Sequence, residues 1–276
     1  MISNETKFFY LIGHPVEHSL SPLMYNKAFE FLKLNFNYRA FDIKPGQLKA
    51  FVQKLREENI GGANVTIPYK TEIMEYVDET DETASSIGAI NTIVNHKGFL
   101  KGYNFDGLAA VKSLEEKCEV KNKKIVLLGA GGAARAICFN LAKKAKEIVV
   151  LSRSLERVKK LETDFDVIVK SLEAGNLKKE LANADILINC TPVGMWPKID
   201  ETLVKRNQLN PKTFVFDIIY NPVETRLLKE AKAVGCKTLN GVEMFINQGV
   251  ETFELLTGKK APVELMRKAV IEALRE

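Results

Sequence analysis

The feature that most constrains the fold is a glycine-rich segment between an apolar run and a helical one. From Ile125 to Ala134 the sequence reads I-V-L-L-G-A-G-G-A-A, which places a G-x-G-x-x-A pattern directly after four apolar residues. In such a pattern Gly129 permits a tight turn, Gly131 lets the backbone approach a pyrophosphate, and Ala134 allows a helix to pack closely against a strand. We therefore expect a dinucleotide at the start of this helix. The alternative is a glycine-rich turn without a ligand.

The residues after the next apolar run indicate which dinucleotide binds. An NAD site normally ends its second strand in Asp or Glu, whose carboxylate bonds the ribose 2′-hydroxyl. Here Val149–Leu151 runs into Ser152, Arg153 and Ser154, with Arg157 one helical turn further on. Guanidinium groups and hydroxyls suit a 2′-phosphate, which a carboxylate would repel. The segment predicts NADP as the cofactor, and the alternative is a pair of solvated arginines at a helix start.

Length, composition and charge exclude several classes of protein. The 276 residues suffice for two domains, and 46% hydrophobic with 27% charged residues is typical of a chain that folds throughout. The 40 basic and 35 acidic residues are interspersed, so the net charge of +5 forms no basic stripe and predicts no nucleic-acid partner. No apolar run approaches the roughly 18 residues of a transmembrane helix, so we expect no membrane partner.

The cysteines and histidines indicate neither disulfides nor a metal site. The four cysteines are scattered without a C-x-x-C pair, which predicts buried free thiols. Residues 1–7 lack the basic start and apolar stretch of a secretory signal, so we expect a cytoplasmic protein. His14 and His18 are separated by Pro15, which favours a loop, and no other ligand cluster accompanies them. We therefore expect no metal.

Short apolar runs alternate with amphipathic segments along the chain, which is typical of an α/β protein with mainly parallel sheets. We expect strands at Phe8–Ile12, Tyr38–Ile43, Ala63–Ile67, Ile90–Val94, Phe99–Lys101, Ile125–Leu128, Ile148–Leu151, Ile186–Asn189 and Phe214–Asp217. We expect helices at Leu23–Leu32, Gln47–Glu58, Thr71–Val77, Ala133–Lys144, Leu155–Glu162, Leu177–Ala182, Met244–Leu256 and Val263–Leu274.

The more regular rhythm from Lys124 onward predicts a Rossmann-type NADP-binding domain inserted as one block. We place it at residues 107–241, within a discontinuous α/β substrate-binding domain made of residues 1–106 and 242–276. Residues 95–98 are a short polar stretch suited to a hairpin, so the mainly parallel sheet of the outer domain is expected to be mixed. A ligand cleft between two closely joined domains is plausible for this arrangement.

Two serines stand just before the first predicted helix. Ser19 and Ser21 lie in the sequence H-S-L-S-P, in which Pro22 would be the first helical residue. One hydroxyl could cap the helix, which is the alternative interpretation of both residues. Two hydroxyls at a helix start also make a small site for a carboxylate.

Further polar residues lie at predicted strand ends in the first domain. Asn64 and Thr66 share one face of a strand, and Lys70 begins the next element beyond a proline. Lys70 alone would be interpreted as a surface lysine. Together with Asn91 at the start of a strand and Asp106 at the proposed domain junction, it predicts a pocket for a polyhydroxylated carboxylate.

These segments together resemble the shikimate dehydrogenase family, NADP-dependent enzymes that reduce 3-dehydroshikimate in aromatic amino acid biosynthesis. The resemblance covers essentially the whole chain. It rests on S-L-S-P at 19–22, N-V-T-I-P at 64–68 with Lys70, G-A-I-N-T at 88–92, Y-N-x-D-G at 103–107, G-A-G-G-A-A at 129–134, N-x-T-P-x-G-M at 189–195, D-x-x-Y-x-P at 217–222 and Q-G at 248–249.

The resemblance implies a role for each matched position. The substrate, shikimate or 3-dehydroshikimate, would be held at its carboxylate by Ser19, Ser21 and Tyr220. Its ring oxygens would be bonded by Thr66, Asn91, Asp106 and Gln248, with Asn64 nearby. Lys70 and Asp106 would be the catalytic pair at the reacting oxygen. Because hydride delivery to a ketone builds an alkoxide, a lysine ammonium can donate the proton that neutralises it.

The implied cofactor contacts lie in the second half of the chain. The pyrophosphate would be received by Gly129, Ala130, Gly131, Gly132 and Ala133. The adenosine phosphate would be bound by Ser152, Arg153, Ser154 and Arg157. The nicotinamide side would be lined by Thr191, Ile218, Gly241 and Met244. Glu82 matches a further cofactor contact, and the protein would be a monomer or homodimer.

Two departures from the family pattern leave alternatives open. The family often has Asn-Arg-Thr where this chain has Ser152 to Ser154, which keeps the arginine, and Phe105 replaces the usual threonine beside Asp106. One rival is a quinate/shikimate dehydrogenase that uses NAD, against which the missing acidic residue after Leu151 counts. Another is a dinucleotide-sensing regulatory protein without catalysis, against which the presence of both Lys70 and Asp106 counts.

Overall fold

The chain folds into two compact units, seen in a computed structural model that describes residues 6–57, 59–155 and 158–275. The first unit comprises Met1–Phe105 and Gln248–Glu276, and the second comprises Asp106–Asn247. The second unit therefore includes Asp106 and residues 242–247, which the sequence analysis assigned to the outer domain.

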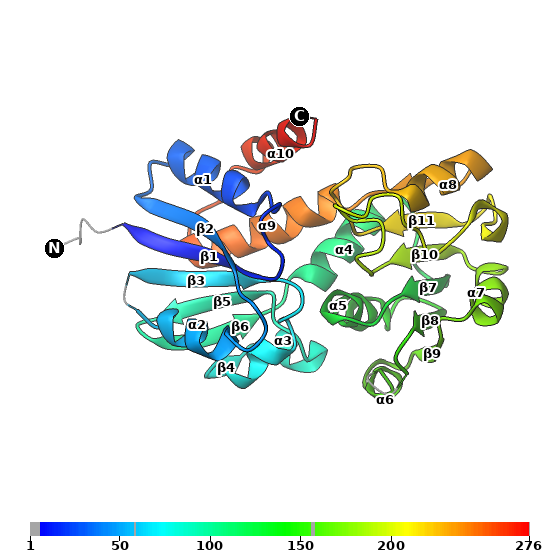
Figure 1. Ribbon diagram of the computed structural model, residues 1–276, viewed down its shortest axis with the longest axis horizontal. Coiled ribbons are helices and arrows are strands. Elements are labelled where there is room, and N and C mark those ends of the chain that lie inside the picture. Colours follow the sequence, from blue (N-terminus) through cyan, green and yellow to red (C-terminus); the bar gives the residue numbers. More distant parts are fainter. Residues whose placement is uncertain (1–5, 58, 156–157, 276) are drawn as a thin grey trace. The chain divides into compact units, whose positions relative to one another are not determined.

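The first unit contains a six-stranded mixed sheet in the order β2-β1-β3-β5-β6-β4 (Figure 1). Its strands are β1 Lys7–Gly13, β2 Phe36–Asp42, β3 Ile60–Val65, β4 Glu79–Thr80, β5 Thr92–His96 and β6 Phe99–Tyr103. β1 pairs in parallel with β2 and β3, and β4 with β6. β5 is antiparallel to both β3 and β6, so the expected hairpin at residues 95–98 is present.

Alternating residues of β1 explain why both faces of this sheet are covered. Tyr10 and Ile12 belong to a buried cluster that includes Leu48 and Val52 of α2 (Leu48–Lys54). Phe9 points to the other face, where its ring lies 5.7 Å from that of Phe29 in α1. The other helices of this unit are α1 Ser21–Phe31, α3 Glu82–Ile87, the last part of α9 Val242–Thr257 and α10 Val263–Ala273. The helix expected at Thr71–Val77 is only a short 3-10 turn, η1 Glu72–Glu75.

The second unit contains a six-stranded sheet in which every pairing is parallel. Its strands are β7 Lys124–Leu128, β8 Glu147–Ser152, β9 Ile168–Ser171, β10 Ile186–Asn189, β11 Phe214–Asp217 and β12 Thr238–Leu239. Read from one edge, the order is β9-β8-β7-β10-β11-β12 (Figure 1). This is the doubly wound 3-2-1-4-5-6 arrangement, whose strand order reverses between β7 and β10.

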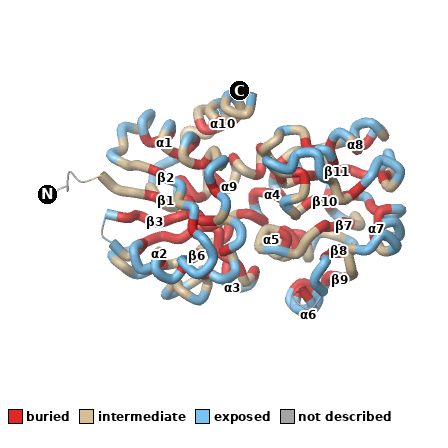
Figure 2. Tube along the Cα trace, viewed as in Figure 1, coloured by how far each residue is buried: buried red, intermediate tan, exposed pale blue. Residues whose placement is uncertain are grey.

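Two buried clusters lie on the opposite faces of this parallel sheet. Ile125 and Leu127 of β7 pack with residues of α4, α5 and α6, whereas Val126 and Leu128 pack with residues of α7 and α8. The helices of this unit are α4 Asp106–Glu115, α5 Gly132–Leu141, α6 Lys160–Phe165, α7 Ala174–Leu181, η2 Arg206–Gln208, α8 Arg226–Val234 and the first part of α9. The central strands are almost continuously buried along the Cα trace (Figure 2), as expected for a sheet covered on both faces. α6 begins at Lys160, later than the predicted start at Leu155.

Candidate active site

One edge of the first sheet collects the predicted substrate residues of the first unit. Asn64 of β3 pairs with Thr92 of β5, and Thr92 pairs with Tyr103 of β6. Because β5 runs antiparallel to its neighbours, its start lies at the edge where β3 and β6 end. Thr66 and Asn91 lie just outside the bounds of β3 and β5 at this edge.

A buried hydrogen-bond network holds the asparagines at this edge. The Asn64 side chain is 5% exposed; its Oδ1 accepts from the Tyr38 hydroxyl at 2.8 Å, and its Nδ2 donates to the Asn91 carbonyl at 3.2 Å. Nδ2 also lies 3.2 Å from the Thr92 hydroxyl and 3.3 Å from that of Thr252 in α9, and these two hydroxyls are 2.9 Å apart. Asn64 is thus bonded within the protein through both ends of its amide.

The same network fixes the orientation of the Asn91 side chain. Its Oδ1 accepts from the Thr92 hydroxyl at 3.0 Å and from the backbone N–H of Phe105 at 3.1 Å. An amide whose oxygen is held by two protein donors presents its nitrogen, a donor, in the other direction. The oxygen end of the Asn91 amide is therefore held by the protein.

The two serines occupy the start of α1, but neither caps it. Ser21 is the first helical residue, the N-cap is Leu20, and no side chain bonds the first turn in the manner of a cap. Instead, the Ser19 Oγ accepts from the backbone N–H of Ser21 at 3.2 Å, and its hydroxyl donates to the Ser21 Oγ at 3.2 Å. The capping interpretation is therefore not observed, and the two hydroxyls form a pair.

Gln248 lies on α9 beside α1. The next residue, Gly249, accepts a hydrogen bond at its carbonyl from Tyr25 of α1 at 3.2 Å, and a Cβ added to Gly249 would collide with Met24. Met24 and Tyr25 lie one helical turn after Ser21 in α1. The segment of α9 that carries Gln248 therefore packs against the same helix that begins at Ser21.

Lys70 and Asp106 lie in different units. Lys70 follows β3 in a turn, where its carbonyl accepts the N–H of Ile90, the residue before Asn91, at 2.7 Å. Asp106 is the first residue of α4 and is 4% exposed. It directly follows Phe105, whose ring stacks on that of Tyr103 with centroids 6.4 Å apart. Glu82 is exposed at the start of α3, after the N-cap Asp81.

In the second unit, the glycine-rich segment forms the expected turn between β7 and α5. Gly129 has a φ of +92°, and a Cβ added there would be 2.7 Å from Cγ2 of Thr191, which follows β10. The turn therefore lies where the strand order reverses, the usual place for a ligand in such sheets.

The start of α5 fits the phosphate groups of a dinucleotide. Gly131 is the N-cap of α5, with no side chain bonding the first turn, and no heavy atom lies within 4 Å of a Cβ built on it. Ala130 packs against the neighbouring core cluster, and Gly132 and Ala133 form the first turn of α5. The N–H groups of that first turn have no partner within the helix, so this end of α5 suits an anion.

The end of β8 carries the residues expected at the adenosine phosphate. Ser152 is the last residue of the strand, and its Oγ accepts from the N–H of Ser154 at 3.3 Å. Arg153 and Ser154 are exposed beyond it. Arg157 lies outside the described residues.

The residues expected beside the nicotinamide are brought together in the second unit. Ile218 packs against the same buried cluster as Met244, and a Cβ on Gly241 would collide with the Ile218 carbonyl. Tyr220 stacks on Phe245 of α9, with ring centroids 4.3 Å apart. Thr191 follows β10, Ile218 and Tyr220 follow β11, and Gly241 follows β12.

Asp217 is a residue that the sequence analysis noticed only as part of a motif. It is the last residue of β11 and is fully buried. Burial raises the pKa of its carboxyl from 3.8 to about 6, although hydrogen bonds from Thr225, Ile219 and Asn189 lower it. Burial likewise raises the pKa of the Cys190 thiol well above its usual range, with Cys138 and Asp217 adding to the effect. The signal that could have found Asp217 is an acidic residue ending an otherwise apolar strand.

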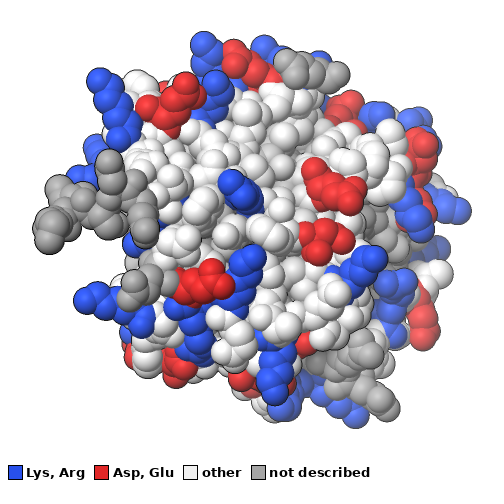
Figure 3. Space-filling model, turned by 60° about the vertical axis from the view of Figure 1, so that its left-hand side comes forward, with Lys and Arg blue, Asp and Glu red and all other residues white. Residues whose placement is uncertain are grey.

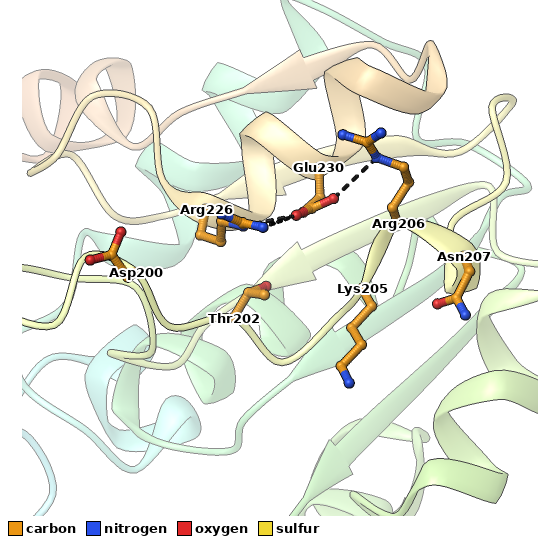
Figure 4. A pocket seen from close by; sticks show the side chains of 7 residues that line it. All are labelled: Asp200, Thr202, Lys205, Arg206, Asn207, Arg226 and Glu230. Atoms are coloured by element: carbon orange, nitrogen blue, oxygen red, sulfur yellow. Dashed lines mark hydrogen bonds and ion pairs between the residues drawn. The ribbon is translucent and has the colours of Figure 1, made fainter.

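A pocket of about 830 Å³ lies elsewhere in the second unit (Figure 4). It is lined by Asp200, Thr202, Lys205, Arg206, Asn207, Arg226 and Glu230, none of which is a predicted site residue. Glu230 pairs with both Arg206 and Arg226, so its single negative charge offsets half of theirs.

The described surface and helices add three observations. On the face drawn in Figure 3, basic and acidic side chains are interspersed. Within the described residues there is no group of three or more His, Cys, Asp or Glu arranged to hold a metal ion. None of the helices in the described ranges has the length and apolar character to span a membrane.

Comparison with known proteins matches almost the whole chain to one family. Models of the shikimate dehydrogenase substrate binding domain, of shikimate / quinate 5-dehydrogenase and of the shikimate 5′-dehydrogenase C-terminal domain match residues 11–93, 110–235 and 241–271. The shikimate dehydrogenase (NADP(+)) of Methanocaldococcus jannaschii is 46% identical over 281 residues, covering 99% of each chain.

Two solved structures extend this similarity to the fold. A shikimate dehydrogenase in complex with NADP+ is 45% identical with a TM-score of 0.90, covering 100% of this chain and 98% of that one. A shikimate 5-dehydrogenase from Listeria monocytogenes in complex with shikimate and NAD is 38% identical with a TM-score of 0.82, covering 97% of each chain.

A Rossmann-type unit with a glycine turn at its switch point, joined to a mixed-sheet α/β unit, defines a class of dinucleotide-dependent oxidoreductases. Within that class, the chain belongs to the shikimate dehydrogenase family.

Proposed function

We propose that the protein catalyses the reversible NADPH-dependent reduction of 3-dehydroshikimate to shikimate, with most substrate contacts made by residues of the first unit and most cofactor contacts by residues of the second. The observation that carries the proposal is the end of the first sheet where Asn64, Asn91 and Thr92 are held by buried hydrogen bonds, with Lys70 in the turn after β3. Such a set suits a ligand with several hydroxyls and a carboxylate. The full-length similarity to NADP(+)-dependent relatives supports the same reaction.

Each unit contributes recognisable substrate contacts. The hydroxyl pair of Ser19 and Ser21 would bind the carboxylate, assisted by Tyr220. Asn91 would donate to a ring oxygen, and Thr66, Gln248 and Asp106 would bond the remaining hydroxyls. Asn64 would support the position of Asn91, because the Asn64 amide is bonded to Tyr38, Asn91, Thr92 and Thr252.

Lys70 and Asp106 would perform the proton transfer. NADPH, when bound, supplies the hydride that reduces the ketone. The Lys70 ammonium donates a proton to the oxygen that becomes negative, and in the reverse direction the neutral amine accepts one. Asp106 orients Lys70 and accepts a hydrogen bond from a neighbouring ring hydroxyl.

The pyrophosphate of the cofactor would be bound by backbone groups, and its 2′-phosphate by side chains. Gly129 to Ala133 would receive the pyrophosphate at the start of α5, and Thr191, Ile218, Gly241 and Met244 would line the nicotinamide, with Glu82 as a further contact. The 2′-phosphate would be bound by Ser152, Arg153, Ser154 and Arg157. Since no carboxylate ends β8, NADP is favoured over NAD.

The test is the oxidation of NADPH by the purified protein with 3-dehydroshikimate, then with 3-dehydroquinate, and both again with NADH. We expect turnover with NADPH and 3-dehydroshikimate, and lower kcat/KM in the other three combinations. Higher kcat/KM with NADH would favour the NAD-linked quinate/shikimate alternative. Tight NADPH binding without turnover on either ketone would favour the regulatory alternative.

We further propose a cellular location and an oligomeric state for the enzyme. None of the four cysteines forms a disulfide, which fits a reducing compartment and supports a cytoplasmic location. A monomer or homodimer is expected. Sedimentation of the purified protein with and without NADP would decide between these two states.

A further inference from the structure

A chain of buried hydrogen bonds joins three segments at the carboxyl end of the parallel sheet. Asp217 Oδ1 accepts from Asn189 Nδ2 at 3.0 Å and from the Ile219 N–H at 3.2 Å. Its Oδ2 accepts from the Thr225 hydroxyl at 2.7 Å. One carboxylate thus ties the end of β10, the segment after β11 and the start of α8.

The carboxylate is one of two acceptors that orient the Asn189 amide. An ionised carboxylate and a backbone carbonyl only accept hydrogen bonds, so Asp217 at 3.0 Å and the Val193 carbonyl at 3.3 Å both require the amide to present its nitrogen. Asn189 Oδ1 then faces Thr191, where it accepts from the backbone N–H at 3.1 Å and from the hydroxyl at 2.7 Å. The Thr191 Oγ1 in turn accepts from the Val193 N–H at 3.2 Å. The position of Thr191 therefore depends on Asp217 through Asn189.

The other oxygen of Asp217 acts in the same way on the α8 side. The Thr225 hydroxyl donates to Asp217, and its oxygen accepts from the Leu228 N–H at 3.3 Å as the N-cap of α8. The bond from Ile219 N–H meanwhile holds the segment that continues to Tyr220. The carboxylate therefore fixes the direction of the bond from Thr225 and reinforces the orientation of the Asn189 amide.

We propose that Asp217 is a positioning residue, which holds Thr191 and Ile218 in the arrangement that the nicotinamide half of the cofactor requires. The proposal rests on the proposed function, because those residues are assigned to the nicotinamide there. Burial of a carboxylate without a cationic partner is costly, and an apolar or amide side chain would avoid that cost. The raised pKa of Asp217 reflects the cost, and the neighbouring Cys190 thiol interacts with it.

The experiment compares Asp217→Asn, Thr225→Val and Thr225→Ser with the control Thr213→Val. Thr213 lies just before β11, at the opposite end of the same strand, and is equally buried, with its hydroxyl donating to the Ala184 carbonyl at 2.9 Å. Calorimetry measures the affinity for NADP+ and for 2′,5′-ADP, which lacks the nicotinamide. Steady-state kinetics with shikimate measure kcat and KM in parallel.

Asp217→Asn and Thr225→Val should weaken NADP+ while leaving 2′,5′-ADP affinity unchanged, and kcat should fall by about ten- to a hundredfold. Thr225→Ser keeps the hydroxyl and should restore both values, whereas Thr213→Val should lower thermal stability alone. Equal loss of both nucleotides, or variants that differ from Thr213→Val only in stability, would overturn the proposal. If Asp217→Asn does not fold, the Thr225 pair gives the same comparison.

The affinity measurements distinguish this proposal from the proposed function. A wild-type protein that binds NADP+ but does not oxidise shikimate would contradict the function and leave the affinity comparison intact. A wild-type protein that turns over normally, with Asp217→Asn unchanged in kcat and in NADP+ affinity, would contradict the positioning role alone.

Discussion

The two units hold their polar groups in different ways. In the first unit, side chains at the sheet edge are fixed by other side chains, as Asn64 is by Tyr38 and Thr252. In the second unit, the start of α5 offers backbone N–H groups at a glycine turn, and the neighbouring Arg153 is exposed. The first arrangement is specific because each donor and acceptor is oriented in advance. The second is tolerant, because backbone groups and solvated cations suit any dinucleotide with the right charge.

This difference predicts which substitutions each unit accepts. An isosteric change in the first unit leaves a buried polar atom without its partner, which costs about 1–3 kcal/mol. A surface change in the second unit costs little stability and acts through the ligand's charge. Asp217 is the exception, since it gives the second unit a buried network like that of the first.

Lys70→Ala should have the largest effect and show that the first unit supplies a residue essential to the chemistry. Removal of a positioned acid-base group lowers kcat by roughly 10²–10⁴. NADPH affinity should stay unchanged in calorimetry, because the residue lies in the first unit. Asp106→Asn should also lower kcat. If the two residues act as one catalytic pair, the fold-loss of kcat in the double variant should be smaller than the product of the two single losses. Near wild-type kcat in Lys70→Ala at saturating substrate would refute the assignment.

Asp217 should make the stability of the second unit depend on pH. The folded pKa of about 6 lies above the ordinary 3.8, so the contribution of this group is fully present below pH 3.8 and is lost as pH rises through 6. A shift of this size corresponds to roughly 3 kcal/mol. Denaturant unfolding of the wild type and of Asp217→Asn should therefore show a difference in free energy that falls with pH between about 4 and 7. A difference that is independent of pH would contradict the raised pKa.

Arg153→Asp tests whether the second unit selects its cofactor by charge. A charge-assisted hydrogen bond to the 2′-phosphate contributes about 1.5–3 kcal/mol, which is roughly ten- to hundredfold in binding. The variant should lose that factor in KM for NADPH and change little with NADH. Lys159→Asp is a control of equal charge change on the same segment. A wild-type enzyme equally efficient with both cofactors would remove the basis of this prediction.

The family, the fold class and the glycine turn were predictable from sequence, and the structure and comparisons confirm the first two. Motifs such as the one at Gly129 are local, so a short segment carries the information. The doubly wound sheet follows similarly from apolar runs, although the two-residue strands β4 and β12 are too short to show a pattern. The boundary between the units at Asn247 could not be predicted either, because it falls inside α9 and the sequence shows one uninterrupted helix there.

The supporting networks could not be predicted, because they join residues far apart in the chain. Thr92 and Thr252 are 160 positions apart, and nothing near Thr252 distinguishes it from other polar residues on α9. The hydroxyls of Ser19 and Ser21 looked equally suitable as helix caps, since cap and ligand site use the same residue types before a helix. Only their bonds to each other separate the two interpretations.

Thr252→Val should show how strongly the first unit depends on the buried hydrogen bonds of Thr252. The change removes a hydroxyl bonded to Thr92 and Asn64 without altering shape, and we expect a loss of about 1–3 kcal/mol in unfolding free energy. KM for shikimate should rise, because Thr92 and Asn64, which both bond Asn91, lose a shared partner. Thr257→Val is the matched control, since its hydroxyl bonds the Phe253 carbonyl of the same helix. Equal effects of the two variants on KM would mean that the network does not reach the substrate.

Ser21→Ala should have the smallest effect and separates binding from folding at the start of α1. Because Leu20 is the N-cap and neither serine bonds the first turn as a cap, the helix should lose less than the about 1 kcal/mol typical of a removed cap. A neutral hydrogen bond to the substrate contributes about 0.5–1.5 kcal/mol, so KM for shikimate should rise by roughly two- to tenfold with kcat nearly constant. Ser19→Ala should raise KM alike, since the two hydroxyls bond each other and would share one carboxylate, but it should cost more stability because the Ser19 hydroxyl also accepts the Ser21 N–H. Unchanged KM in both variants would leave the first unit without its predicted carboxylate anchor, whereas a cap-sized loss of stability with constant KM would restore the capping interpretation that the geometry argues against.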